Sequence, residues 1–344
     1  MMEKMRLGRT NQMVSRCGFG ALPVQRLDQT AAQRLLRQAY DHGVDFFDTA
    51  RGYSDSEEKI GLALADVRSR IILATKTPAK DGPTLRANLE TSLKMLQTDH
   101  IDLYQLHNPR QLPDPTGPDG LYAALQQARQ DGLIRFVGIT SHRLEVALAA
   151  ARSGLYDTVQ FPLNLLSSPA DLELIEVCRQ NDVGLIAMKA LSGGLLTNIP
   201  AAFAFLRQYA NVLPIWGLQR ESELAEFLAL EANPPVMTDE LWAAVARDRS
   251  ELAGSFCRGC GYCLPCPAGI PIPMAARMTL LLSRAPAAPL LTPEWQAKMA
   301  LIEDCRHCGQ CSSHCPYQLD TPALLRQNLD DYRRIIRNNA SHGR

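Results

Sequence analysis

Residues 84–107, TLRANLETSLKMLQTDHIDLYQLH, contain the unit of sequence that decides the fold. Leu85, Leu89 and Leu93 recur at helical spacing, and the apolar run IDLYQLH that follows has the length of a buried strand. The same order of a helical stretch, a polar corner and a short apolar run returns along the first two thirds of the chain. The predicted strands are residues 17–22, 44–49, 71–76, 101–107, 133–140, 155–161, 185–190 and 212–217.

Eight apolar strands that alternate with helices are typical of a parallel sheet covered by helices, which is an α/β fold. Eight such units favour a closed (β/α)8 TIM barrel. The alternative is an open doubly wound sheet, but no GxGxxG motif follows the first predicted strand, as a dinucleotide-binding fold of that kind would favour. The sequence therefore predicts the barrel.

The alternating pattern stops near residue 233. The stretch ANPPVMTDE at 232–240 contains a Pro-Pro break, and a charged helical stretch at 241–253 leads into a segment rich in Cys and Pro. We therefore predict a boundary near residue 235, with a barrel domain at 1–235 and a small, mainly helical domain at 236–344.

Composition excludes several classes of protein. The 36 basic residues balance the 36 acidic ones, so no overall field attracts nucleic acid or an anionic membrane. No apolar run approaches the roughly 20 residues of a bilayer span, and the first residues lack the apolar core of a signal peptide. We expect a cytoplasmic protein, in which closely spaced cysteines more often bind metal than form disulfides.

Polar residues stand where the predicted strands end, the position of catalytic residues in such barrels. Asp48, Lys76 and His107 close three strands, and Tyr53 follows Asp48 by five residues. Each residue alone is more typical of packing or of a helix cap. Together they fit proton delivery to a carbonyl oxygen, with the Lys lowering the pKa of the Tyr, the Asp orienting the Lys and the His polarising the carbonyl.

Six motifs then occur in one order: DTARGYSDSEEKIG, ILATK, LYQLH, GITSH, TVQFPLN and the Gly-Gly after LIAMKAL. In this the chain resembles the aldo-keto reductase family from residue 5 to about residue 230. The resemblance implies an NAD(P)-dependent oxidoreductase that reduces a small aldehyde or ketone, or oxidises the corresponding alcohol. It also implies a catalytic tetrad with Tyr53 as general acid, and nicotinamide contacts from Ser141 and Gln160.

The chain departs from the family at two positions of the cofactor site. His142 stands where the family usually has Asn, and Met188 stands where an aromatic residue commonly covers the nicotinamide, although a Met can cover a ring through its sulfur. Loops after the seventh and eighth strands often hold phosphate in such barrels. The candidates are Gly193, Gly194, Gly217 and Arg220. Arg220 would select NADP over NAD by binding a 2′-phosphate, or is a helix-start arginine on a solvated face.

Two cysteine motifs lie in the tail. The first is Cys257-x2-Cys260-x2-Cys263-x2-Cys266-Pro, and the second is Cys305-x2-Cys308-x2-Cys311-x3-Cys315-Pro, the bacterial ferredoxin spacing for [4Fe–4S] clusters. Two zinc ribbons are the alternative, but ribbons use two cysteines per knuckle and each motif here has four. The tail resembles a two-cluster ferredoxin domain, which implies that the fourth Cys of each motif binds the other cluster.

The two predicted sites use electrons differently. A nicotinamide delivers a hydride, whereas a cluster takes one electron at a time, so a direct link needs a carrier such as a flavin, for which no motif is visible. The clusters are therefore structural, serve a redox partner protein or an undetected cofactor, or meet a substrate that takes single electrons. In the alternative hypothesis the barrel is catalytically idle and the protein is an electron-transfer or scaffold subunit of a larger redox complex.

Overall fold

The computed structural model describes residues 2–284 and 286–342. These residues form two compact units. The barrel unit contains the residues up to Ala190 together with Pro200–Leu241, and the cysteine unit contains Leu191–Ile199 together with the residues from Trp242 onward. Leu191–Ile199 thus lies between two barrel elements in the sequence and belongs to the cysteine unit in the fold.

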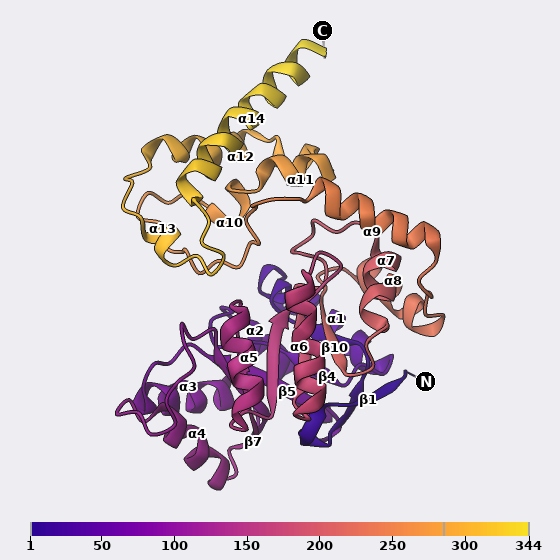
Figure 1. Ribbon diagram of the computed structural model, residues 1–344, viewed down its shortest axis with the longest axis vertical. Helices are drawn as coiled ribbons and strands as arrows, with labels where there is room; N and C mark the ends of the chain where they lie inside the picture. Colours follow the sequence, from indigo (N-terminus) through magenta and orange to yellow (C-terminus); the bar gives the residue numbers. More distant parts are fainter. Residues whose placement is uncertain (1, 285, 343–344) are drawn as a thin grey trace. The chain divides into compact units, whose positions relative to one another are not determined.

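The barrel unit is built around a closed sheet of eight parallel strands, as predicted (Figure 1). The strands follow one another around the barrel in chain order, and the last pairs with the first. They are β3 (Gly18–Gly20), β4 (Phe46–Asp48), β5 (Ile72–Thr77), β6 (Ile101–His107), β7 (Ile134–Thr140), β8 (Thr158–Pro162), β9 (Gly184–Met188) and β10 (Val212–Gly217).

Helices follow the strands and supply the outer layer. Several begin with a side chain that caps the free amides of the first turn: Asp28 accepts from the amide of Ala31, and Ser168 accepts from that of Asp171. Helix α1 buries Leu35 and Leu36 on the face that the spacing predicts. The helices are α1 (Gln29–Asp41), α2 (Ser56–Leu64), α3 (Gly82–Met95), α4 (Leu121–Gln130), α5 (Leu144–Ser153), α6 (Pro169–Gln180), α7 (Ile199–Arg207) and α8 (Glu221–Ala232).

A short antiparallel hairpin precedes the barrel and was not predicted. It consists of β1 (Lys4–Arg6) and β2 (Met13–Ser15), and it buries Met5 and Val14 in the same apolar cluster as Phe46 of the barrel. The strand sequences KMR and MVS mix apolar with polar residues and lie in no continuous apolar run, which explains why the sequence did not reveal them.

The cysteine unit is mainly helical and has its own apolar core. Ile272, Met278, Met299 and Leu325 are buried in that core, and the Tyr332 hydroxyl donates to the carbonyl of Leu290 at 2.7 Å. The helices are α9 (Asp239–Glu251, which starts at the end of the barrel unit), α10 (Ile272–Ala275), α11 (Met278–Arg284), α12 (Pro293–Ala300), α13 (Gln310–Ser313) and α14 (Thr321–His342).

Helices α10, α11 and α12 occupy the segment between the cysteine motifs, where the sequence predicts helix. Short 3₁₀ helices complete the fold: η1 (Gly8–Thr10), η2 (Pro23–Arg26), η3 (Ala65–Arg70), η4 (Ala288–Leu290) and η5 (Leu301–Asp304). In the part of the chain that the structure describes, none of the helices has both the length and the apolar character needed to cross a membrane.

Candidate functional site

A buried ion pair joins the ends of two neighbouring barrel strands. The Nζ atom of Lys76 on β5 donates to Oδ2 of Asp48 on β4 at 2.6 Å and to the carbonyl of Thr49 at 2.6 Å. Burial raises the pKa of Asp48 and lowers the pKa of Lys76. The positive charge of Lys76 acts against the first shift, and the negative charge of Asp48 acts against the second. Such a pair holds its charges because both groups are hydrogen-bonded to each other.

Tyr53 and His107 lie beside this pair. The Nζ atom of Lys76 is 5.2 Å from the centroid of the Tyr53 ring, and the His107 ring meets the Tyr53 ring edge-on with the centroids 5.8 Å apart. The structure thus brings together the four residues that the sequence proposes as a catalytic tetrad.

The pKa of Tyr53 shifts in the direction opposite to the one predicted from the sequence. We expected Lys76 to lower it, but burial, followed by the negative charge of Asp48, raises the pKa of the phenol above its usual value. Lys76 is held by Asp48 and Thr49, and its effect on the resting phenol is outweighed by burial and by the charge of Asp48. Burial, with the charge of Lys76, lowers the pKa of His107 to about 3, so this imidazole is neutral at ordinary pH.

Gln105 belongs to the site and was missed from the sequence. Its side chain is fully buried, and Nε2 donates to Oδ1 of Asp48 at 3.2 Å. A signal was present, because Gln105 precedes His107 by two residues on one strand and therefore points to the same face.

Glu57 is a second residue of the site that was not predicted from the sequence. Its carboxylate is buried, accepts from the hydroxyls of Thr75 at 2.7 Å and Ser92 at 2.8 Å, and forms an ion pair with Arg51. The amide of Arg51 in turn donates to the carbonyl of Lys76 at 2.9 Å. Glu57 therefore fixes the turn that carries Tyr53, and its position within the DTARGYSDSEEKIG motif was the available signal.

The predicted nicotinamide contacts lie at the ends of β7 and β8. The backbone amide of Ser141 donates to the carbonyl of Gln160 at 3.0 Å, and Nε2 of Gln160 faces Oδ2 of Asp48 at 3.4 Å. The other amide atom of Gln160, Oε1, is buried and accepts no hydrogen bond within the described residues. A buried acceptor of this kind fits the amide N–H of a nicotinamide.

Met188 and His142, the two residues that depart from the family pattern, are also buried. Met188 ends β9 and packs in the apolar cluster of the barrel. The backbone amide of His142 donates to Oδ1 of Asn108 at 3.0 Å. Burial, with Lys189 and His107 nearby, lowers the pKa of His142 well below its usual value, so it adds no charge to this region.

The predicted phosphate ligands are spread over three places. Gly217 ends β10, and Gly193 and Gly194 adopt positive φ angles of 67° and 90° in the cysteine unit. Arg220 precedes α8 with its side chain 68% exposed, and its guanidinium pairs with Glu223 at 2.6 Å. An anion at Arg220 therefore has to compete with Glu223.

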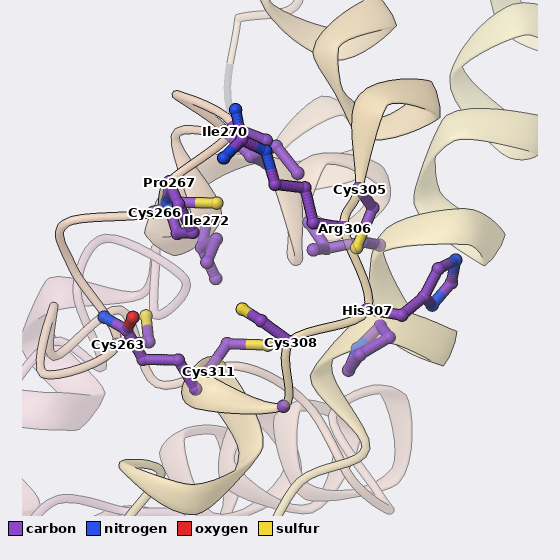
Figure 2. A pocket seen from close by; sticks show the side chains of 15 residues that line it. Cys263, Cys266, Pro267, Ile270, Ile272, Cys305, Arg306, His307, Cys308 and Cys311 are labelled. Carbon is purple, nitrogen blue, oxygen red and sulfur yellow. The ribbon is translucent and has the colours of Figure 1, made fainter.

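The cysteine motifs meet at one open pocket (Figure 2). The pocket opens to solvent, and its walls contain thiols of both motifs. Those thiols are Cys263, Cys266, Cys305, Cys308 and Cys311. The side-chain Nε2 of Gln310 donates to the carbonyl of Pro265 at 2.9 Å, which ties the second motif to the residue before Cys266.

Contacts around the first motif also suit a cluster. The backbone amide of Gly259 donates to Sγ of Cys257 at 3.4 Å. Burial, with the nearby thiols of Cys257 and Cys260, raises the pKa of Cys263 to about 12, and thiolates this close together need a bound cation. Among the described residues no three His, Cys, Asp or Glu side chains already stand as a metal-ligand group, so the thiols must come closer together to bind one. The all-thiol donor set fits iron–sulfur chemistry.

Comparison with known proteins identifies both parts of the chain. The model of the aldo/keto reductase family matches residues 16–202, which is more than half of the chain. The chain belongs to the aldo/keto reductase family. It is an enzyme of the NAD(P)-dependent oxidoreductase type. A second model, described as a 4Fe-4S dicluster domain, matches residues 256–320, so this aldo/keto reductase carries a C-terminal 4Fe–4S domain.

Individual relatives match the barrel. An uncharacterized oxidoreductase of Bacillus subtilis, YrpG, is 32% identical over 57% of this chain and 68% of its own length. The NADH-specific methylglyoxal reductase of Escherichia coli is 26% identical over 68% of this chain and 81% of its own length. The solved structure of an aldo/keto reductase from Klebsiella pneumoniae, in complex with NADP and acetate, covers 72% of this chain and 95% of that one, with a TM-score of 0.58 and 23% identity.

Proposed function

We propose that this aldo/keto reductase reduces a small aldehyde or ketone with NAD(P)H, or oxidises the corresponding alcohol. The observation that carries the proposal is the grouping of Asp48, Lys76, Tyr53 and His107 at the ends of the barrel strands. The group combines a proton donor, a cation, a carboxylate and a neutral imidazole, which is what proton delivery to a carbonyl oxygen requires.

Tyr53 is the proton donor in this proposal. Its raised pKa keeps the phenol protonated at ordinary pH, so the proton is in place when substrate binds. As the proton leaves, negative charge develops on the phenol oxygen, and the ammonium of Lys76 over the ring stabilises that charge. Asp48 holds Lys76 in position, and Gln105 holds Asp48 through its other carboxylate oxygen.

His107 polarises the carbonyl. Because its pKa is near 3, the ring stays neutral and offers one N–H to the substrate oxygen without competing as an acid. A neutral donor beside Tyr53 orients the carbonyl so that its oxygen faces the phenol. Glu57 and Arg51 keep the turn of Tyr53 fixed during this transfer.

The nicotinamide would be held by Ser141 and Gln160, with Met188 against the ring and with Gly217 and Arg220 at the phosphates. Gly193 and Gly194, the other phosphate residues predicted from the sequence, belong to the cysteine unit. When bound, it supplies the hydride that reaches the carbonyl carbon. The unpartnered Oε1 of Gln160 supports the amide contact. We propose NADP as the cofactor, by analogy with the Klebsiella enzyme and through Arg220; the Escherichia coli relative, which is NADH-specific, is the reason to test both.

We also propose that residues 236–344 form a domain with two [4Fe–4S] clusters and crossed ligands. The first cluster takes Cys257, Cys260, Cys263 and Cys315, and the second takes Cys305, Cys308, Cys311 and Cys266. Two contacts support the crossing. Cys266 shares the pocket with three thiols of the second motif, and the guanidinium of Arg258 in the first motif lies 5.9 Å from the ring of Tyr317, just beyond Cys315.

Free, closely spaced cysteines favour a reducing compartment, and we place the protein in the cytoplasm. In this proposal the clusters stabilise the domain by joining its two ends. Electrons would pass between the dinucleotide and the clusters only through a two-electron to one-electron carrier, such as a flavin or a redox partner protein.

The test is an assay of NADPH and NADH oxidation by the purified protein against a panel of aldehydes and ketones, together with its absorbance spectrum and iron content. The proposal expects carbonyl-dependent oxidation of NADPH and iron–sulfur absorbance without flavin bands. A protein that binds neither dinucleotide nor turns over any carbonyl would support the idle-barrel alternative instead. A protein with zinc and no iron would end the cluster proposal.

A further inference from the structure

Asn108, the residue after His107, forms hydrogen bonds to the segment that carries Ser141. Its backbone amide donates to the carbonyl of Thr140 at 3.0 Å and to the Thr140 hydroxyl at 3.1 Å. Its side-chain Oδ1 accepts from the backbone amide of His142 at 3.0 Å. A single residue at the end of β6 therefore contacts the end of β7 on both sides of Ser141.

The chain leaves the strand direction at Asn108, and the side chain continues the pairing with β7. His107 is the last residue of β6 that pairs with β7, opposite Thr140. Asn108 has a positive φ angle of 57°, which ends the extended backbone. In a continued parallel ladder the amide of His142 would pair with a backbone carbonyl of β6, and Oδ1 of Asn108 accepts that hydrogen bond instead.

The position of Asn108 has two requirements that few residues meet together. A positive φ angle is unfavourable for most residues, but Gly, Asn and Asp adopt it readily. The hydrogen bond to the His142 amide requires a side-chain oxygen at the reach of Oδ1, which Asn and Asp have and Gly lacks. Aspartate should therefore preserve both features, whereas glycine keeps the backbone conformation and removes the acceptor.

The β7 side of this contact is also joined to β8. The backbone amide of Ser141 donates to the carbonyl of Gln160 at 3.0 Å, and the Ser141 hydroxyl accepts from the backbone amide of Arg143 at 3.0 Å. Ser141 and Gln160, the two residues proposed to bind the nicotinamide, are thus held together. Beyond the last ladder pair, Asn108 joins them to the strand end that carries His107.

We propose that Asn108 is a positioning residue that fixes the nicotinamide site relative to His107, an inference that rests on the function proposed above. The carbonyl of the substrate binds at His107, and the nicotinamide binds at Ser141 and Gln160. Reaction requires the two reacting carbons to be close and aligned, so a small displacement of the Ser141 segment lowers the rate. The hydrogen bond from His142 to Asn108 prevents that displacement.

The experiment compares the binding of two ligands to the full-length protein by calorimetry, together with kcat for carbonyl reduction. The ligands are NADPH and 2′-phospho-ADP-ribose, which has the phosphates of NADPH but no nicotinamide. Asn108→Gly should weaken NADPH binding on the order of tenfold, as expected for one lost hydrogen bond, and leave the binding of 2′-phospho-ADP-ribose unchanged. Its kcat should also fall, because the ring is no longer held against the substrate. If the enzyme prefers NADH, the matching pair of ligands is NADH and ADP-ribose.

Further variants separate the hydrogen bond from the fold. Asn108→Asp keeps the acceptor and tolerates the backbone conformation, so its affinity for NADPH should be close to that of the wild type. If Asn108→Gly does not fold, Asn108→Ser, whose hydroxyl is too short to reach the His142 amide, should show the same selective loss.

Asn11→Gly is the matched control. Asn11 also has a positive φ angle, 54°, and its Oδ1 accepts from Nη1 of Arg6 at 3.1 Å, but it lies in the hairpin that precedes the barrel. This variant should leave the binding of both ligands and kcat unchanged.

The outcomes distinguish this inference from the proposed function. If Asn108→Gly weakens both ligands equally, or weakens neither, the inference is wrong while the function stands. An Asn108→Asp variant that binds NADPH as weakly as Asn108→Gly would also overturn the inference. A wild type that binds NADPH but reduces no carbonyl contradicts the proposed function, and the comparison of the two ligands then still decides the inference.

Discussion

The Nζ atom of Lys76 lies 2.6 Å from Oδ2 of Asp48, and both side chains are almost completely buried. A charged pair in this position is costly to remove from water, and each partner is stable there only because the other is present. The pair stands on adjacent strands, β5 and β4, so the parallel pairing of these two strands brings it together. The proposed chemistry of Tyr53 depends on this pair, and so does the stability of this end of the barrel.

Replacing Lys76 with Met should therefore destabilise the protein by about 3–5 kcal/mol, because it leaves the Asp48 carboxylate buried without its partner. The urea concentration at the midpoint of unfolding measures this. The double variant Asp48→Asn/Lys76→Met removes both charges and should recover a large part of the loss. Equal midpoints for the single and double variants would show that the pair is not coupled.

The rate of carbonyl reduction should not change with pH in the range where an ordinary histidine titrates. His107 has a pKa lowered to about 3, so it stays neutral throughout the range in which an ordinary histidine, with a pKa near 6.5, changes charge. Tyr53 must be protonated to donate, and because its pKa is raised, reduction should persist at about pH 10, where an ordinary tyrosine is half ionised.

The measurement is kcat/KM for reduction between pH 5 and 11, with cluster absorbance checked at each pH as a control for loss of the metal centre. An inflection near pH 6.5 that disappears in His107→Gln would contradict the assigned state of this residue.

Much of the fold could be predicted from the sequence because each barrel strand lies within an apolar run, and these runs alternate with helical stretches. The eight apolar runs and the helices between them identified the barrel. Four polar residues could be placed at or just after strand ends from three motifs, DTARGYSDSEEKIG, ILATK and LYQLH. The hairpin Lys4–Ser15 was missed because its strands, KMR and MVS, lie in no continuous apolar run. Gln105 was missed because the prediction took only the last residue of the strand, although the two-residue period places Gln105 on the same face as His107.

Other features depend on folding in a way that sequence does not reveal. The pKa of Tyr53 was predicted in the wrong direction, because a neighbouring lysine can be anticipated from a motif but the burial that outweighs it cannot. The assignment of Leu191–Ile199 to the cysteine unit, held by Arg277 and Arg284, has no local pattern either, since these arginines lie more than eighty residues away in the chain.

Cofactor choice should depend on the competition between Glu223 and a 2′-phosphate for Arg220. Arg220→Ala should weaken NADPH binding more than NADH binding. Glu223→Gln should strengthen NADPH binding, because it releases Arg220 from a 2.6 Å ion pair while keeping an oxygen for the backbone amides of Gln219 and Arg220. Dissociation constants from cofactor fluorescence measure both effects. Equal changes for NADPH and NADH would exclude Arg220 as the selector.

The amide site has its own prediction. Gln160→Leu removes the buried acceptor for the nicotinamide amide and should weaken NADPH and NADH by a similar factor, on the order of tenfold for one lost hydrogen bond. Binding of 2′-phospho-ADP-ribose, which lacks the nicotinamide, is the control and should not change. A loss that is equal for the probe and for NADPH would mean that Gln160 acts through the fold.

In the proposed crossed arrangement, Cys266 of the first motif binds the second cluster and Cys315 of the second motif binds the first. Cys266→Ser should damage the cluster held by Cys305, Cys308 and Cys311, with which Cys266 shares a pocket, and Cys315→Ser should damage the other cluster. Iron analysis and EPR measure this, with about eight irons expected in the wild type for two cubanes. If Cys266→Ser removes the cluster of its own motif instead, the crossed arrangement is wrong. Cys178→Ser, at a buried helix position outside both motifs, should leave both clusters intact.

The most direct test of the central claim is the turnover of Tyr53→Phe. This change keeps the ring beneath Lys76 and beside His107 but removes the proton to be transferred. With a carbonyl that the wild type reduces, kcat should fall by about 10²-fold or more, while the dissociation constant for NADPH and the iron content stay unchanged. Turnover close to that of the wild type would contradict the assignment of Tyr53 as the proton donor, and with it the proposed reaction of this site.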